Sequence, residues 1–139
     1  MKSRHNLLLL LLPLLMLSAG SCTEDDRACT EEFVMLTISL SYPDTSPVLL
    51  DDYTVTDLSS GQVLSLSGVD QWIDSVNRLE GRYFLLTDGE YGLTDAQGWP
   101  FRFQGYIDTT EVVSRTFSIR NDGCHVRLAS GNPDIVINP

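Results

Sequence analysis

Three cysteines and one histidine are the residues of this sequence best suited to chemistry. Cys22, Cys29, Cys124 and His125 lie beyond an apolar leader, and the second histidine lies within it. Nucleophilic catalysis needs a nucleophile and a base that a third group orients. Cys124 and His125 cannot supply that pair within a strand, because neighbouring side chains point to opposite faces. We therefore expect His125 to face solvent, and we predict no catalytic residue.

Carboxylates are abundant, with 19 Asp and Glu residues, but their spacing matches no metal or acid–base motif. Zinc needs three or four Cys, His or carboxylate ligands, and Asp88, Glu90 and Asp95 lack the spacing of a calcium loop. Among so many acids, close pairs of the kind that glycosidases use arise by chance. The sequence contains no glycine-rich phosphate loop. We expect neither a metal ion nor a cofactor, and we predict that the protein is not an enzyme.

Aromatic side chains offer one further chemistry, because their faces can stack on the rings of sugars. Trp72 lies on a predicted helical stripe, and Phe101 and Phe103 share one strand face, so we expect these three in the core. Tyr91 and Trp99 lie near predicted turns and form the pair that we expect to contact a ligand such as a glycan. Packing of the same two residues at the rim of the core remains the alternative.

The first 21 residues have the organisation of a secretory signal peptide. Lys2 and Arg4 precede an apolar run over 7–17 that Pro13 interrupts, and small residues follow at 18–21. The run is too short for a transmembrane helix, which needs about 20 apolar residues. We therefore expect residues 1–21 to be removed on export.

The segment around Cys22 resembles the lipobox of bacterial lipoproteins, in which the cysteine is diacylated and becomes the new N-terminus. Glu24, Asp25 and Asp26 resemble the signal that exports Bacteroidetes-type lipoproteins to the outer face of the outer membrane. The resemblance implies a lipid anchor, an acidic tether over 22–31 and display on the cell exterior. The alternatives are an ordinary secretory signal without lipid, and an acidic segment that serves only as a solvated tether.

The odd number of cysteines is consistent with this resemblance. If Cys22 carries lipid, Cys29 and Cys124 remain, and an exported chain lies in an oxidising compartment. We therefore expect a disulfide between Cys29 and Cys124. Two separate buried thiols are the alternative.

Alternation of apolar and polar residues predicts that the rest of the chain is mainly β-strand, with turn-forming residues between the segments. Apolar residues spaced by three and four predict one amphipathic helix near 69–80. Seven or eight short strands indicate an all-β domain over 32–139, an antiparallel β-sandwich of transthyretin-like or immunoglobulin-like type. The predicted strands cover 34–41, 50–57, 62–67, 82–87, 100–107, 111–119, 124–128 and 135–137.

Two motifs support this expectation of the fold. The sequence TDAQGW at 94–99 resembles the TDxxG turn of carboxypeptidase regulatory-like domains, which share the transthyretin-like sandwich. The sequence DGCHV at 122–126, followed by SG at 130–131, resembles the ending of a group of Bacteroidetes lipoproteins placed near that fold. These resemblances imply a binding or spacer role and carry no catalytic residues.

The overall charge restricts the partners. The formal net charge is −10, and an acidic surface of this kind disfavours nucleic acid and anionic membrane surfaces. We therefore expect a non-enzymatic, lipid-anchored outer-membrane protein that binds or scaffolds an envelope protein or a glycan. The alternative is an accessory that captures a glycan or peptide for a partner enzyme or transporter.

Overall fold

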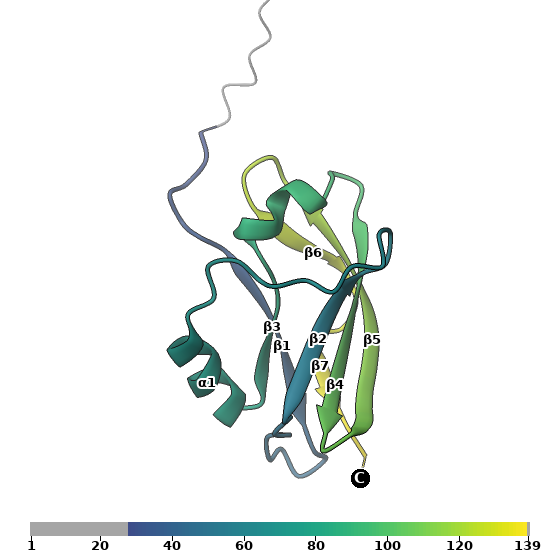
Figure 1. The fold of residues 1–139 in the computed structure, drawn as a ribbon. Helices are drawn as coiled ribbons and strands as arrows, with labels where there is room; N and C mark the ends of the chain where they lie inside the picture. The colour runs from purple at the N-terminus through teal and green to yellow at the C-terminus, as the bar shows by residue number, and fades with distance from the viewer. Residues whose placement is uncertain (1–27, 139) are drawn as a thin grey trace, which may run out of the picture.

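The computed structural model describes residues 28–138 (Figure 1). The predicted signal peptide, Cys22 and the acidic residues at 24–26 lie outside the described residues. The elements are β1 (Met35–Ser41), β2 (Asp52–Asp57), α1 (Gln71–Leu79), β3 (Arg82–Thr87), η2 (Asp88–Leu93), β4 (Trp99–Ile107), β5 (Thr110–Asn121), β6 (Val126–Ser130) and β7 (Asp134–Val136).

The seven strands form two sheets that face each other as a sandwich-like domain (Figure 1). One sheet has the order β3-β1-β7 and the other the order β2-β4-β5-β6. This confirms the predicted all-β class and the single short helix. One pairing differs from the antiparallel expectation, because β7 crosses over from the second sheet and runs parallel to β1.

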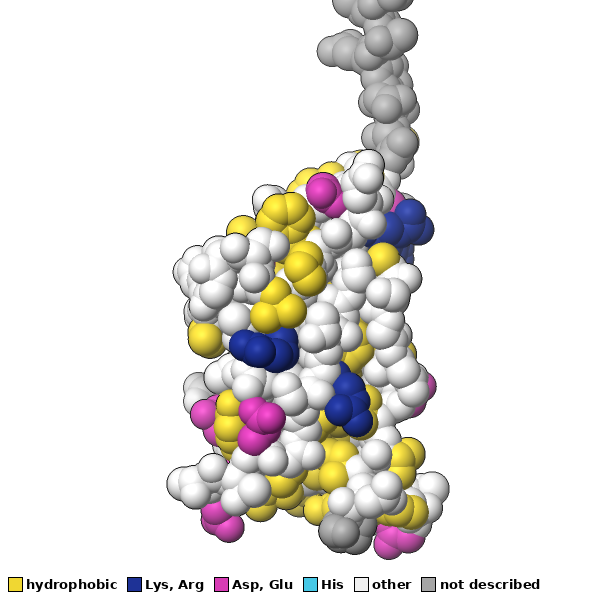
Figure 2. Space-filling model, turned by 90° about the vertical axis from the view of Figure 1, so that its right-hand side faces the viewer, with side chains coloured by type: hydrophobic (Ala, Val, Ile, Leu, Met, Phe, Trp, Pro, Cys, Tyr) yellow, Lys and Arg dark blue, Asp and Glu magenta, His cyan; other side chains and the backbone are white. Residues whose placement is uncertain are grey.

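Both sheets contribute alternating apolar side chains to one core between them. Phe101 and Phe103 on β4 are fully buried, as the alternation along that strand predicts. Other strands supply further core residues, among them Ile38, Leu40, Val55, Phe117, Ile119 and Ile135. By contrast, the outer surface on the β5 side carries charged groups scattered among neutral side chains, with hydrophobic ones visible toward both ends of the domain (Figure 2).

The predicted strand at 62–67 is wrong. Only a single bridge joins Val63 to Thr56, next to a hydrogen bond from the Leu64 amide to Val55. The chain then leaves β2, and the Ser67 amide donates a hydrogen bond to Glu90 of η2 at 2.6 Å. The segment therefore crosses from one sheet toward the other, and its alternation does not produce a ladder.

The predicted helix forms as α1, and Asp70 caps it by accepting hydrogen bonds from the amides of Trp72 and Ile73. The helix packs against β3, an edge strand whose residues 83–87 are all buried. The expected core position of Trp72 is wrong, since this residue is 72% exposed. Periodicity identifies an apolar stripe but does not say which way the stripe faces.

Tyr83 joins the core to the chain that precedes β2. Its buried hydroxyl accepts a hydrogen bond from the Leu50 amide and donates one to the Val48 carbonyl, both at 2.8 Å. Burial raises the pKa of this phenol, which therefore stays neutral.

We expect Tyr83→Phe to lower the free energy of unfolding by about 1–3 kcal/mol, because a buried amide and a buried carbonyl lose their partner. Urea denaturation measures the loss, and Tyr106→Phe, which removes a hydroxyl from a half-buried tyrosine on β4, is the control. Equal unfolding midpoints for the two variants would contradict the expectation.

Candidate functional site

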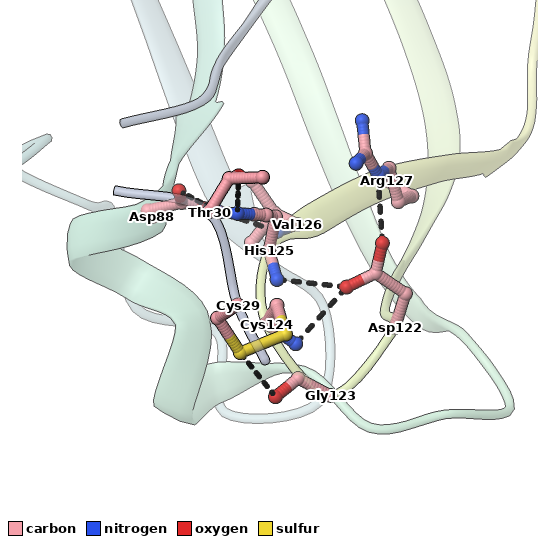
Figure 3. The surroundings of a disulfide bond; sticks show 9 residues. All are labelled: Cys29, Thr30, Asp88, Asp122, Gly123, Cys124, His125, Val126 and Arg127. Carbon is pink, nitrogen blue, oxygen red and sulfur yellow. Dashed lines mark hydrogen bonds and ion pairs between the residues drawn. A yellow bond between two sulfur atoms is a disulfide. The ribbon is translucent and has the colours of Figure 1, made fainter. Parts of the chain in front are cut away.

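The side chains best suited to chemistry gather where the N-terminal segment meets the start of β6 (Figure 3). Cys29 and Thr30 come from the segment before β1, and Asp88 opens η2. Cys124 and His125 come from the turn before β6. We call these five residues the clamp.

The first contact of the clamp is covalent. Cys29 and Cys124 form a disulfide across 95 residues of sequence, with their Cα atoms 5.4 Å apart. This confirms the pairing that the cysteine count predicts. The bond fixes the N-terminal segment to the turn before β6 (Figure 3).

The expectation that His125 faces solvent is wrong, because this residue is only 7% exposed. Alternation does not apply here, since β6 begins at Val126 and His125 belongs to the preceding turn. Its Nδ1 lies 2.7 Å from Oδ2 of Asp88, and its Nε2 lies 3.0 Å from the Thr30 hydroxyl. The carboxylate beside Nδ1 favours a proton on that nitrogen, so Nδ1 donates to Asp88 and the other ring nitrogen pairs with the Thr30 hydroxyl.

Asp88 is the centre of the clamp. In addition to His125, its carboxylate accepts hydrogen bonds from the amides of Val34 and Val126, both at 2.8 Å. Burial acts to raise the pKa of Asp88, but the two amides and the His125 ring together hold it below its usual value. One ionised side chain thus joins the start of β1, the start of η2 and the start of β6.

A second carboxylate orders the turn that carries Cys124 and His125. Asp122 accepts a hydrogen bond from Nε of Arg127 at 2.8 Å, and it also accepts from the amides of Cys124 and His125. The Arg127 side chain and these amides hold the pKa of Asp122 well below its usual range. These local hydrogen bonds therefore hold the turn that precedes β6.

Thr30, His125 and Asp88 have the connectivity of a hydroxyl–imidazole–carboxylate triad. Acyl transfer also needs amide donors for the oxyanion, and the amides of residues 124, 125 and 126 already donate to Asp122 and Asp88. The imidazole itself lies buried beneath the N-terminal segment. The arrangement is suited to holding that segment in place.

Tyr91 and Trp99, the expected ligand contacts, are both half-buried and pack against the core. The indole N–H of Trp99 donates to Asp57 at 3.0 Å, and the Tyr91 carbonyl accepts from Thr94. Both residues thus make the contacts that we expect if they pack at the rim of the core.

The acids near these residues serve local structure. Glu90 accepts hydrogen bonds from Ser67 and Thr87, while Asp95 accepts from the amides of residues 97 and 98. The TDxxG sequence thus forms an Asx-type turn that ends at Gly98 with φ +112°. Among residues 28–138, His, Cys, Asp and Glu form no group of three that could hold a metal ion.

The role of Asp88 and the burial of His125 were not predicted from the sequence. Asp88 lies 37 residues before His125, and nothing in the local pattern links the two. The DGCHV motif at 122–126 was the available signal, because Asp122, Cys124 and His125 all take part in this region of the structure.

Within residues 28–138, no helix is long and apolar enough to span a membrane. Comparisons of the chain with protein-family models, with curated proteins and with solved structures each find no match.

Proposed function

We propose that this protein is a lipid-anchored lipoprotein displayed on the outer face of the outer membrane, where its domain acts as a non-enzymatic binding or scaffolding module. The observation that carries the proposal is the use of the cysteines. Cys29 and Cys124 are bonded to each other, so Cys22 is the one cysteine of the sequence outside that bond. Cys22 is also the residue that follows the signal-peptide pattern.

The position of the clamp supports an anchored role. Cys29 lies seven residues after Cys22, a stretch of roughly 23–25 Å when extended. A chain anchored at Cys22 would therefore carry the domain close to the membrane and join it at a covalently fixed point. A disulfide at that point suits an exported protein, because disulfides form and persist in oxidising compartments.

We further propose that the fold is the transthyretin-like sandwich of carboxypeptidase regulatory-like domains. The TDxxG turn before β4 and the two-sheet arrangement support it. Domains of that kind bind or space other parts of a protein, and the clamp here holds the chain rather than presenting a reactive group.

The lipid anchor is tested by Cys22→Ser in the producing cell. We expect the wild-type chain to be recovered with the outer membrane and the variant to be released in soluble form. Ser21→Ala, a change next to the modified position, is the matched control and should stay with the membrane. Membrane retention of the Cys22→Ser variant would contradict the proposal.

Surface display is tested separately by changing Glu24, Asp25 and Asp26 together to alanine. We expect this variant to keep its lipid but to be protected from protease added to intact cells, because the export signal is lost. The matched control changes three acids within the folded domain, Asp44, Asp108 and Asp134, which are exposed. Equal digestion of the triple variant and the wild type would contradict display through this signal.

A further inference from the structure

The outer face of the four-stranded sheet carries an arginine near its centre. Phe101 and Phe103 of β4 point into the core, so Arg102 between them points outward. Arg102 lies directly opposite Thr56 of β2 on one side and Thr116 of β5 on the other. Residues that lie opposite each other on neighbouring strands share one face of the sheet, so these three side chains form a row across it.

The positions around Arg102 on this face carry uncharged hydrogen-bonding groups, and we call Arg102 together with them the Arg102 face. The Gln104 side chain donates to Glu111, which lies at the border of the face. The five hydroxyls of the face have no hydrogen-bond partner among residues 28–138. The uncharged members are Thr54, Thr56, Gln104, Ser114, Thr116 and Ser118.

Arg102 differs from the other arginines that the structure describes. Arg115 donates to a backbone carbonyl, and Arg120 is exposed to water. Arg102 is only partly exposed and its Nε is buried, yet it has no hydrogen-bond or ion-pair partner within residues 28–138. The arginines that form ion pairs with carboxylates are Arg78, Arg82 and Arg127.

The unpaired guanidinium indicates the charge of a ligand. Partial removal of a charged group from water is unfavourable when no opposite charge lies beside it. Nε is the one buried nitrogen of Arg102, so the two terminal amino groups can still be reached from solvent. Their planar fork matches the two oxygens of a carboxylate. A carboxylate of a ligand would therefore supply the negative charge that no neighbouring side chain of the described residues supplies.

The surroundings of Arg102 indicate what kind of molecule carries that carboxylate. The chain has a formal net charge of −10, which repels a ligand with many adjacent negative charges. An isolated carboxylate flanked by hydroxyl groups avoids most of this repulsion. Serine and threonine hydroxyls can both donate to such groups and accept from them. The row across three strands spans about 10 Å, so an extended ligand can cover it.

We propose that the Arg102 face binds an oligosaccharide in which uronic acid sugars alternate with neutral sugars. The carboxylate of one sugar pairs with Arg102, and hydroxyls of the chain contact the serine and threonine side chains of the face. This inference rests on the proposed binding role of the domain, and it is independent of the lipid anchor. It also places the ligand away from Tyr91 and Trp99, whose contacts are those of the rim of the core.

The test is titration calorimetry with a short oligosaccharide of glucuronate alternating with N-acetylglucosamine. The protein is used both as the detergent-extracted wild type and as the full Cys22→Ser chain, so the result does not depend on the anchor. We expect both forms to bind it. We expect no binding of the same oligosaccharide with its carboxylates converted to methyl esters, because this probe keeps the other groups of the chain and loses the charge.

Variants of Arg102 identify the site. Arg102→Gln should raise the Kd roughly tenfold or more, because hydrogen bonds to a charged group are lost. Arg102→Lys should recover part of the affinity, since lysine keeps the charge but lacks the fork. Arg82→Gln, at an exposed arginine of the other sheet, is the matched control and should bind like the wild type.

A second measurement uses the unsubstituted domain and does not depend on how a variant folds. In amide NMR spectra of the Cys22→Ser chain, the oligosaccharide should shift the signals of the outward positions of β2, β4 and β5. Shifts centred on Tyr91 and Trp99 instead would overturn the proposal.

Three further results would overturn it. The first is no binding by either form of the chain, and with the wild type still in the membrane this result would leave the anchored role intact. The second is unchanged affinity in Arg102→Gln, or equal binding of the methyl ester. The third is equally tight binding of a glutamate oligomer, which would assign the face to an acidic peptide. Binding by a chain that proves not to be anchored would support the Arg102 face and contradict the anchor alone.

Discussion

Replacing Cys29 and Cys124 by serine is expected to lower the free energy of unfolding by about 2–4 kcal/mol. The disulfide joins residues 95 apart, and a cross-link over so long a loop removes much of the conformational freedom of the unfolded chain. The chain-entropy argument alone gives roughly 4–5 kcal/mol, and strain together with residual structure in the unfolded chain usually reduces it. The loss corresponds to a fall in Tm of roughly 10–20 °C for a domain of this size.

The measurement is urea unfolding in the Cys22→Ser background, which removes the third thiol. The single variants Cys29→Ser and Cys124→Ser should each lose about as much as the double variant, because either change breaks the same bond. Wild type treated with a reducing agent is the control and should unfold with the double variant. Two reactive thiols in the denatured, unreduced parent chain would contradict the disulfide.

Asp88→Ala is expected to lower the free energy of unfolding by roughly 3–5 kcal/mol. The substitution leaves three donors without their acceptor, namely the amides of Val34 and Val126 and Nδ1 of His125. Each donor left unpaired in a buried setting costs about 1–3 kcal/mol. Asp88→Asn retains one acceptor oxygen and should lose less than the alanine variant.

The effect should also depend on pH, in a direction set by the lowered pKa of Asp88. A carboxylate with a lower pKa in the folded chain contributes stability above its unfolded pKa, about 3.9, and loses it as the pH falls through the folded value. The wild type should therefore lose more stability than Asp88→Asn between about pH 5 and pH 2. Glu31→Ala, which removes an exposed acid from the same segment, is the control and should keep the wild-type slope. Parallel pH profiles for wild type and Asp88→Asn would contradict this role of Asp88.

Local sequence was sufficient to predict which side chains of a strand such as β4 point into the core. The alternation along β4 places Phe101 and Phe103 inward, and the structure confirms it, because side-chain direction in a strand has a period of two whatever its neighbours are. The pairing of Cys29 with Cys124 was also predictable, because three cysteines and one predicted lipid site leave a single pair.

Other features depended on contacts that no local pattern contains. Residues 62–67 alternate like a strand, but only Val63 bridges to β2, and the Ser67 amide is instead hydrogen-bonded to Glu90, 23 residues further along the chain. Likewise, β7 pairs in parallel with the edge of β1 that β3 does not occupy, and no local pattern in residues 134–136 specifies that partner or direction.

The candidate sites show the same division. The sequence by itself determined that His125 follows a cysteine and that the segment forming α1 is amphipathic. Only the tertiary structure decided that His125 lies buried against Asp88 and that α1 exposes Trp72 and Leu79. The physical reason is that burial and hydrogen bonding depend on which distant segments meet, whereas strand alternation and helical period depend only on the backbone of the segment itself.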